Sequence, residues 1–106
     1  MVKNKSQIKN IISQYKSELK KNQINPSKII LYGSYAYGQP NQWSDIDIAI
    51  IAKDFGPRST IERMEFLAQK AAKIDDSLEV LGFTANEFQK SKNGIFRQIL
   101  AQGQEF

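Results

Sequence analysis

The sequence predicts an α/β (α+β) fold: a single small domain with a short mixed sheet of about three strands flanked by helices. Short apolar runs, typical of buried strands, alternate with longer stretches in which apolar residues recur every three or four positions, as on one side of a helix. The resulting order is αβαβαβα, without repeats or flexible linkers. A length of 106 residues allows one modest core, so we expect residues 1–106 to form one domain.

The first element is an amphipathic helix, for which Ser6 is the expected N-cap. Its apolar positions follow an i, i+3, i+4, i+7, i+11 pattern and are Ile8, Ile11, Ile12, Tyr15 and Leu19. We expect this helix to end within residues 22–26, because Pro26 disfavours the helical conformation at Asn25.

Three apolar runs are expected to form the sheet, at residues 28–32, 45–52 and 78–83. The second run contains few polar residues besides Asp45 and Asp47, so we expect it to be the central strand. Between the first two runs, Gly33 and Ser34 turn the chain into a short helical turn, and turn-forming residues follow.

Two capping-box spacings predict helices after the second and third strands. Ser59 and Glu62 begin the first, and Thr84 and Glu87 begin the second, which is short. The first has the apolar stripe Ile61, Met64, Leu67, Ala68, Ala71 and Ile74. A last helix is indicated by Phe96, Ile99 and Leu100. Gly103 is its expected end.

The composition excludes several kinds of chemistry. The chain has no cysteine, which excludes disulfides, thiolate nucleophiles and zinc–thiolate sites, and no histidine, which excludes the commonest general base. An enzyme with this composition must use carboxylates, hydroxyls, Lys, Arg or a metal ion bound by carboxylates. No apolar run approaches the roughly 20 residues of a membrane span, and no signal-peptide core follows the N-terminus, so we expect a cytoplasmic protein with no membrane partner.

The net charge of +4 is unevenly distributed. Seven lysines lie in the first 28 residues: Lys3, Lys5, Lys9, Lys16, Lys20, Lys21 and Lys28. They indicate either the solvated side of an amphipathic helix or a surface for an acidic partner or nucleic acid. Aromatic residues are not interleaved with them along the chain, as a platform for single strands would require. RNA is therefore a minor possibility as a partner.

Asp45 and Asp47 are the first candidates for a site. Residues two apart on a strand point to the same side, so both carboxylates would lie on one side and Ile46 and Ile48 on the other. Neighbouring carboxylates repel each other unless a cation lies between them, and Mg²⁺ is a hard cation that prefers oxygen ligands. Alternatively, the two aspartates are polar residues at a strand entrance that bind loop backbone.

The glycine turn at residues 33–38 is the second candidate, because backbone N–H groups at such turns bind phosphate. It fits the first six positions of a P-loop, G-x-x-x-x-G. The P-loop interpretation fails at Gln39 and Pro40, which stand where the phosphate-binding Lys and the Ser/Thr are required. Turns of this kind are also common in proteins that bind no phosphate.

Taken together, GSYAYG at residues 33–38 and SDID at residues 44–47 resemble the signature G-S-x-x-x-G … S-D-[IV]-D of the DNA polymerase β-like nucleotidyltransferase superfamily. The resemblance is nearest to its minimal nucleotidyltransferases, which are frequently paired with an all-helical HEPN protein in toxin–antitoxin systems. It covers most of the chain, including residues 79–88, which are similar to the third strand and following helix of these proteins.

The resemblance implies a role for each matching residue. Gly33 would allow the nucleotide phosphates to approach the backbone, and the Ser34 hydroxyl would donate a hydrogen bond to them. Asp45 and Asp47 would hold Mg²⁺. Glu79 matches the third carboxylate, which would help to bind a second metal ion or deprotonate the attacking hydroxyl.

Two positions depart from the superfamily pattern. The third carboxylate is usually aspartate and is Glu79 here, and position 37 is often arginine and is Tyr37 here. We interpret the neighbouring Tyr35 as a packing residue. Trp43 lies in a polar loop and is a candidate for base stacking or for contact with a partner.

The expected function is that of a Mg²⁺-dependent nucleotidyltransferase. It would transfer NMP, with AMP from ATP as the first choice, to a hydroxyl of a protein partner, as the antitoxin of a HEPN toxin in a hetero-oligomer. Antibiotic-modifying relatives build the acceptor pocket with an additional helical domain, for which 106 residues leave no room. The alternatives are a non-catalytic binding module with a vestigial nucleotide site and an RNA 3′-end nucleotidyltransferase.

Overall fold

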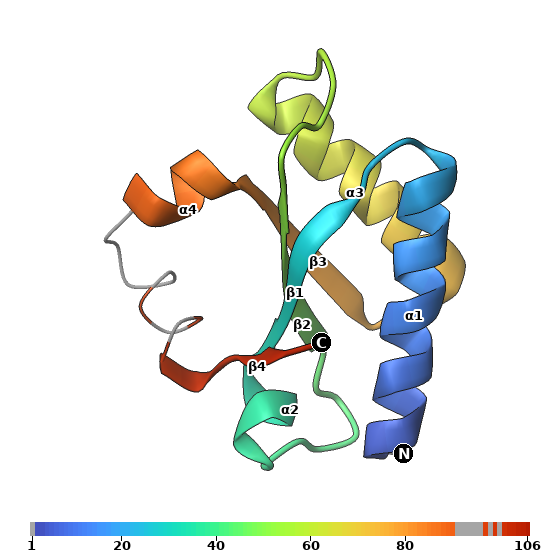
Figure 1. Cartoon of the computed structure of the whole chain (residues 1–106). Helices are drawn as coiled ribbons and strands as arrows, with labels where there is room; N and C mark the ends of the chain where they lie inside the picture. The colour runs from blue at the N-terminus through green and yellow to red at the C-terminus, as the bar shows by residue number, and fades with distance from the viewer. Residues whose placement is uncertain (1, 91–96, 98, 100) are drawn as a thin grey trace.

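The computed structural model describes residues 2–90, 97, 99 and 101–106, which form a mixed sheet with helices on both of its faces (Figure 1). The helices are α1 (Lys5–Lys21), α2 (Ser34–Tyr37), α3 (Thr60–Ile74) and α4 (Ala85–Lys90). The strands are β1 (Pro26–Tyr32), β2 (Ile46–Ala52), β3 (Leu78–Thr84) and β4 (Gln104–Glu105).

The strand order is β3-β2-β1-β4. β2 pairs with β1 in the antiparallel and with β3 in the parallel direction, which confirms both the mixed sheet and the central position of β2. β4 pairs with β1 and makes the sheet one strand wider than expected. No sequence pattern predicted β4, because this strand consists of two polar, exposed residues at the edge of the sheet.

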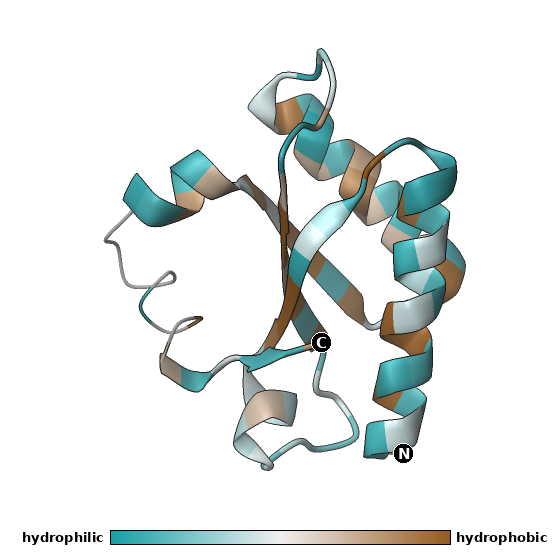
Figure 2. Cartoon of the chain, in the orientation of Figure 1, coloured by the Kyte–Doolittle hydropathy of each residue, from teal (hydrophilic) through white to brown (hydrophobic). Residues whose placement is uncertain are grey.

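The two faces of the sheet bury two separate apolar clusters. Alternate residues of β2, among them Ile46, Ile48 and Ile50, pack against α1 and α3 in the larger cluster. The intervening residues Ala49 and Ile51 belong to a smaller cluster on the other face, on the side of α4. The central strands are mostly apolar, whereas polar and apolar residues alternate along α1 (Figure 2).

Most predicted boundaries are confirmed, and the N-cap of α1 is the main correction. Asn4, not Ser6, caps this helix: its side chain accepts from Gln7 N–H at 2.8 Å, and the Gln7 side chain accepts from Asn4 N–H at 2.8 Å. Reciprocal bonds satisfy two backbone donors at once, which favours Asn4 over a cap that would satisfy one. In addition, β2 begins at Ile46, one residue later than predicted.

The apolar stripe that predicted α3 is only partly buried in the structure. Leu67 and Ala71 are in the core, but Ile61 and Met64 are 69% and 57% exposed. The physical reason is the position of α3 over β3, which is an edge strand, so one flank of the helix extends beyond the sheet.

The predicted last helix falls mainly outside the described residues, which do not include Phe96 and Leu100. Ala101 and Gln102 are helical, and Gly103 follows them and donates its N–H to the Ile99 carbonyl at 2.9 Å. This agrees with Gly103 as the end of the helix. Among the described residues, no helix is both long and apolar enough to cross a membrane.

Replacing Tyr15 by Phe should lower the free energy of unfolding by about 1 kcal/mol. Tyr15 is fully buried, and its hydroxyl donates to the Leu67 carbonyl at 3.0 Å, which links α1 to α3. Urea unfolding followed by circular dichroism measures the change. Tyr35→Phe is the control: the Tyr35 hydroxyl is only partly buried, so water replaces its bond. An equal loss in both variants would contradict a special role for the buried bond.

Candidate functional site

A row of three polar side chains crosses the sheet at the end where β1 finishes and β2 and β3 begin. The strand register pairs Tyr32 with Asp47 and Asp47 with Glu79. Because side chains alternate along each strand, all three lie on the face opposite α1 and α3. Asp45 precedes the first residue of β2 and is exposed, as is Glu79, whereas Asp47 is partly buried. The structure therefore brings the three predicted carboxylates to one place.

The pKa values of two groups record how close these side chains are. Burial, together with the negative charges of Glu79 and Asp45, raises the pKa of Asp47 to about 6. Burial also raises the pKa of Tyr32 to about 12, with smaller contributions from Asp47 and Glu79. The charges of Glu79 and Asp45 thus make Asp47 harder to ionise, and a cation at this place would relieve that repulsion.

The donor set suits a hard cation, although it does not enclose one alone. Within the part of the chain that the structure describes, no three acidic side chains are arranged to hold a single ion. Mg²⁺ in proteins commonly takes one or two carboxylates and completes its shell with water and substrate phosphates. The arrangement of Asp45, Asp47 and Glu79 fits that mode, in which the nucleotide supplies the remaining oxygen ligands.

Gly33 connects the glycine turn to the three carboxylates Asp45, Asp47 and Glu79, which we call the carboxylate row. It has φ 76° and ψ −159°, a conformation that is essentially restricted to glycine, and it caps the N-terminus of α2. A Cβ on Gly33 would overlap the carboxylate of Asp47. The backbone of the turn therefore lies directly against Asp47, with the partly buried Ser34 beginning α2 beside it.

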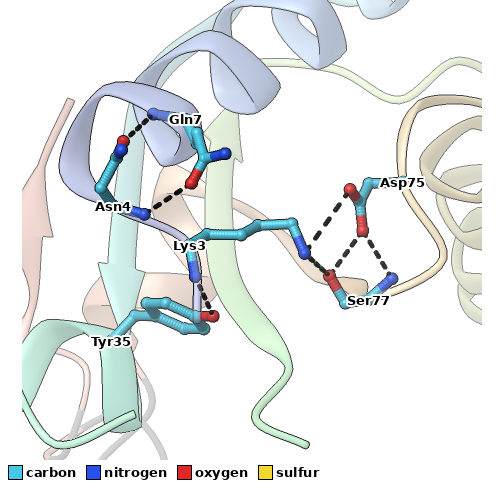
Figure 3. A network of polar contacts seen from close by, with 6 residues as sticks. All are labelled: Lys3, Asn4, Gln7, Tyr35, Asp75 and Ser77. Atoms are coloured by element: carbon cyan, nitrogen blue, oxygen red, sulfur yellow. Dashed lines mark hydrogen bonds and ion pairs between the residues drawn. The ribbon is translucent and has the colours of Figure 1, made fainter. Parts of the chain in front are cut away.

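A polar network fixes α2 and the start of β3 to the N-terminus of α1 (Figure 3). The Lys3 N–H donates to the Tyr35 hydroxyl at 3.2 Å, and Lys3 Nζ lies 3.9 Å from Asp75 Oδ2. Asp75 accepts bonds from the Ser77 N–H at 2.9 Å and the Ser77 hydroxyl at 2.5 Å. Burial opposes ionisation of Asp75, but the bonds from Ser77 and the charge of Lys3 outweigh it and lower the pKa of Asp75.

This network also positions the carboxylate row. The Ser77 carbonyl accepts a bond from the Ile46 N–H at 2.8 Å, so the starts of β2 and β3 are joined one residue before Asp47. Tyr35 packs against the larger cluster, which confirms its interpretation as a packing residue.

The loop between α2 and β2 presents Trp43 to solvent. The Asn41 side chain accepts from the Trp43 N–H at 2.8 Å, and the Ser44 hydroxyl accepts from the Asn41 N–H at 2.9 Å, so the loop is held locally. Trp43 is 82% exposed. Its role in base stacking or partner contact stays a prediction.

Tyr32 is the site residue that sequence reasoning missed. It was counted only as the last residue of a buried strand, yet its phenol belongs to the row with Asp47 and Glu79. The available signal was its place immediately before Gly33, which in an antiparallel pairing of the two strands puts it opposite the aspartates.

A comparison with known families identifies the family to which the chain belongs. The family model described as polymerase beta, nucleotidyltransferase, matches residues 6–106. The chain belongs to this nucleotidyltransferase family. The matched range includes the glycine turn and the two aspartates, on which the resemblance to this family was based, and also Glu79.

Three similar proteins are informative. Protein adenylyltransferase MntA of Shewanella oneidensis is 29% identical over 77 residues, which are 73% of this chain and 50% of MntA. A putative protein adenylyltransferase of Methanocaldococcus jannaschii is 43% identical over 49 residues, which are 46% of this chain and 56% of that protein. The matched regions thus span about half the length of each relative.

The third is a solved structure. One chain in the crystal structure of a toxin–antitoxin complex with AMP-PNP is 31% identical in sequence to the present chain, and the two structures superpose with a TM-score of 0.63. The likeness covers 91% of this chain and 69% of the other. The arrangement of sheet and helices is therefore shared with a protein that was crystallised in the presence of a nucleotide analogue.

In the absence of divalent cations, Asp47 should make the protein less stable as the pH rises from about 4 to about 6. The folded protein, in which the pKa of Asp47 is about 6, keeps a proton that the unfolded chain has released near 3.8, so raising the pH in this window favours unfolding. Asp47→Asn should therefore gain stability at pH 7, on the order of 1 kcal/mol after solvent screening.

The measurement is urea unfolding of the wild type and Asp47→Asn at several pH values. Asp54→Asn is the charge-matched control, because Asp54 lies beyond the opposite end of β2. A constant difference between the wild type and Asp47→Asn from pH 4 to pH 7 would contradict the raised pKa.

Gly33→Ala should both destabilise the protein, by about 1–3 kcal/mol, and displace the Asp47 carboxylate. Gly38→Ala is the matched control: Gly38 also has a positive φ, of 75°, but its Cβ would meet nothing within 4 Å. Urea unfolding measures the stability, and NMR titration of the Asp47 carboxyl measures the displacement. If both variants left the Asp47 pKa unchanged, the close approach of Gly33 to Asp47 would be wrong.

Proposed function

We propose that the chain transfers AMP from ATP, in the presence of Mg²⁺, to a hydroxyl of a HEPN-type toxin and so acts as its antitoxin. The observation that carries this proposal is the carboxylate row beside the Gly33 turn in a chain of the polymerase beta nucleotidyltransferase family. The similarity to protein adenylyltransferases and to a chain of a toxin–antitoxin complex with AMP-PNP supports the choice of reaction and of partner.

Asp45 and Asp47 are the residues that would hold Mg²⁺. When bound there, the ion would neutralise the negative charge that develops on the phosphate oxygens. The raised pKa of Asp47 supports this assignment, because a carboxylate that is costly to ionise alone gains most from a cation.

The glycine turn and Glu79 have complementary roles in the proposed reaction. The Gly33 backbone and the Ser34 hydroxyl bind the phosphates and orient the α-phosphorus. Glu79 is exposed, so an acceptor hydroxyl from another molecule can reach it. Glu79 takes the proton of that hydroxyl while the hydroxyl oxygen bonds to the α-phosphorus and pyrophosphate leaves.

A second candidate function is that of an antitoxin that acts by contact alone and keeps a vestigial nucleotide site. Two observations favour it. Position 37 is tyrosine, which carries no positive charge for phosphate, and the three carboxylates do not by themselves enclose an ion. The two candidates differ in whether neutralisation of the partner depends on the charge of Glu79.

Glu79→Gln should reduce transfer of AMP about 10²–10⁴-fold, the usual range for loss of a general base, and leave binding of the partner unchanged. The assay contains α-labelled ATP, Mg²⁺ and the product of a neighbouring gene as partner. Label on the partner and inhibition of the partner are measured in the same samples. Asp47→Asn should also abolish transfer.

Glu65→Gln is the matched control, because Glu65 is exposed and belongs to α3, which packs on the opposite face of the sheet from Asp47 and Glu79. Full inhibition by a Glu79→Gln variant without detectable transfer would favour the contact-only antitoxin. Transfer at the wild-type rate by the double variant Asp45→Asn/Asp47→Asn would contradict the assignment of the site.

A further inference from the structure

Four lysines lie along one side of α1 in two pairs. Lys5, Lys9, Lys16 and Lys20 follow an i, i+4, i+11, i+15 pattern, which places them within an arc of about 60° and over a length of roughly 22 Å. All four are exposed. Glu18, the one acidic residue of α1, lies on another side of the helix. We call these four residues the lysine row.

The N-terminal half of the lysine row, Lys5 and Lys9, borders two adjoining pockets on the face of the sheet that carries α1, and Lys16 and Lys20 continue the row beyond them. Each pocket has a volume of about 420 Å³, and Lys5, Gln104 and Phe106 line both. Lys9 lines one of them and Tyr37 the other. The beginning of α1, α2 and the C-terminal strand β4 therefore enclose one groove, on the side where both chain ends lie (Figure 1).

Two aromatic rings stand beside the lysines in this groove. Phe106 is 41% exposed and Tyr37 is 45% exposed. In the sequence these residues are far from the lysine row, and only the fold brings them next to it. Bases stack on exposed rings, and lysines follow the phosphates of a strand, so the groove combines the two requirements of a single-strand platform.

The charge of the groove is positive. Its one acidic lining residue, Glu105, has its carboxylate 3.9 Å from Lys28 Nζ, which offsets that negative charge. The carboxylate row of Asp47 and Glu79 lies on the opposite face of the sheet, so it does not repel an anion bound along α1. This charge distribution complements a chain of phosphates.

We propose that the lysine row and the groove bind single-stranded nucleic acid. The phosphates lie along α1, and one or two bases stack on Phe106 and Tyr37. The exposed rings favour nucleic acid over an acidic protein surface, because stacking is available to every base but not to the side chains of Asp and Glu. The surface acts independently of the carboxylate site.

The test measures binding of a fluorescently labelled 12-nucleotide oligouridylate to the whole chain by anisotropy, without ATP or metal ions. With four lysine contacts, the logarithm of the association constant should fall with the logarithm of the salt concentration with a slope of about −3. Lys9→Gln/Lys16→Gln should reduce that slope to about half and weaken binding on the order of 20-fold at 0.1 M salt. Phe106→Leu should weaken binding at least about fivefold.

Lys21→Gln/Lys73→Gln is the matched control, since it removes the same charge from exposed positions outside the lysine row. Equal weakening by the two double variants would overturn the proposal, because binding would then follow net charge alone. Absence of binding at 0.05 M salt would overturn it as well. So would displacement of the oligonucleotide by polyglutamate as effectively as by unlabelled oligouridylate, which would assign the surface to an acidic protein.

Discussion

The register of β2 is the constraint on which the rest of the structure depends. Every residue of this strand is buried except Asp47, which is partly exposed. A slip of one residue would turn Asp47 toward the larger apolar cluster beneath α1 and α3, and would move Ile46, Ile48 and Ile50 to the face of the smaller cluster, where Ala49 and Ile51 now pack. The burial of a carboxylate is so costly that the alternative register is excluded. The residue that serves the site thus also fixes the sheet.

The site is a place where local stability is reduced. Burial and two neighbouring negative charges oppose the ionisation of Asp47, against which the backbone of Gly33 lies. The two apolar clusters and the network from Lys3 to Ser77 compensate for this cost by joining the elements on either side. Proteins commonly depart from the rules of stable design at functional sites and compensate elsewhere.

Local patterns were sufficient for most of the fold and for the carboxylates. Two aspartates on one face of an apolar strand, and a glutamate at the start of another, could be placed together once the two strands were taken as neighbours. Features that depend on distant segments could not: the overhang of Ile61 and Met64, the pairing of β4 with β1, and the proximity of Phe106 to the lysines of α1. The Asn4–Gln7 cap is different, because its spacing is that of the two capping boxes that were predicted, and it was overlooked in the sequence.

The placement of Trp43 determines what optical spectroscopy can observe in this protein. The chain has one tryptophan, and it lies in the loop next to the aspartates with 82% of its surface in water. Its emission therefore resembles that of an unfolded chain even in the native state, and denaturation changes it little. The same property makes the indole a local reporter: its fluorescence responds to binding near the loop that precedes Asp45 and changes little when the core unfolds.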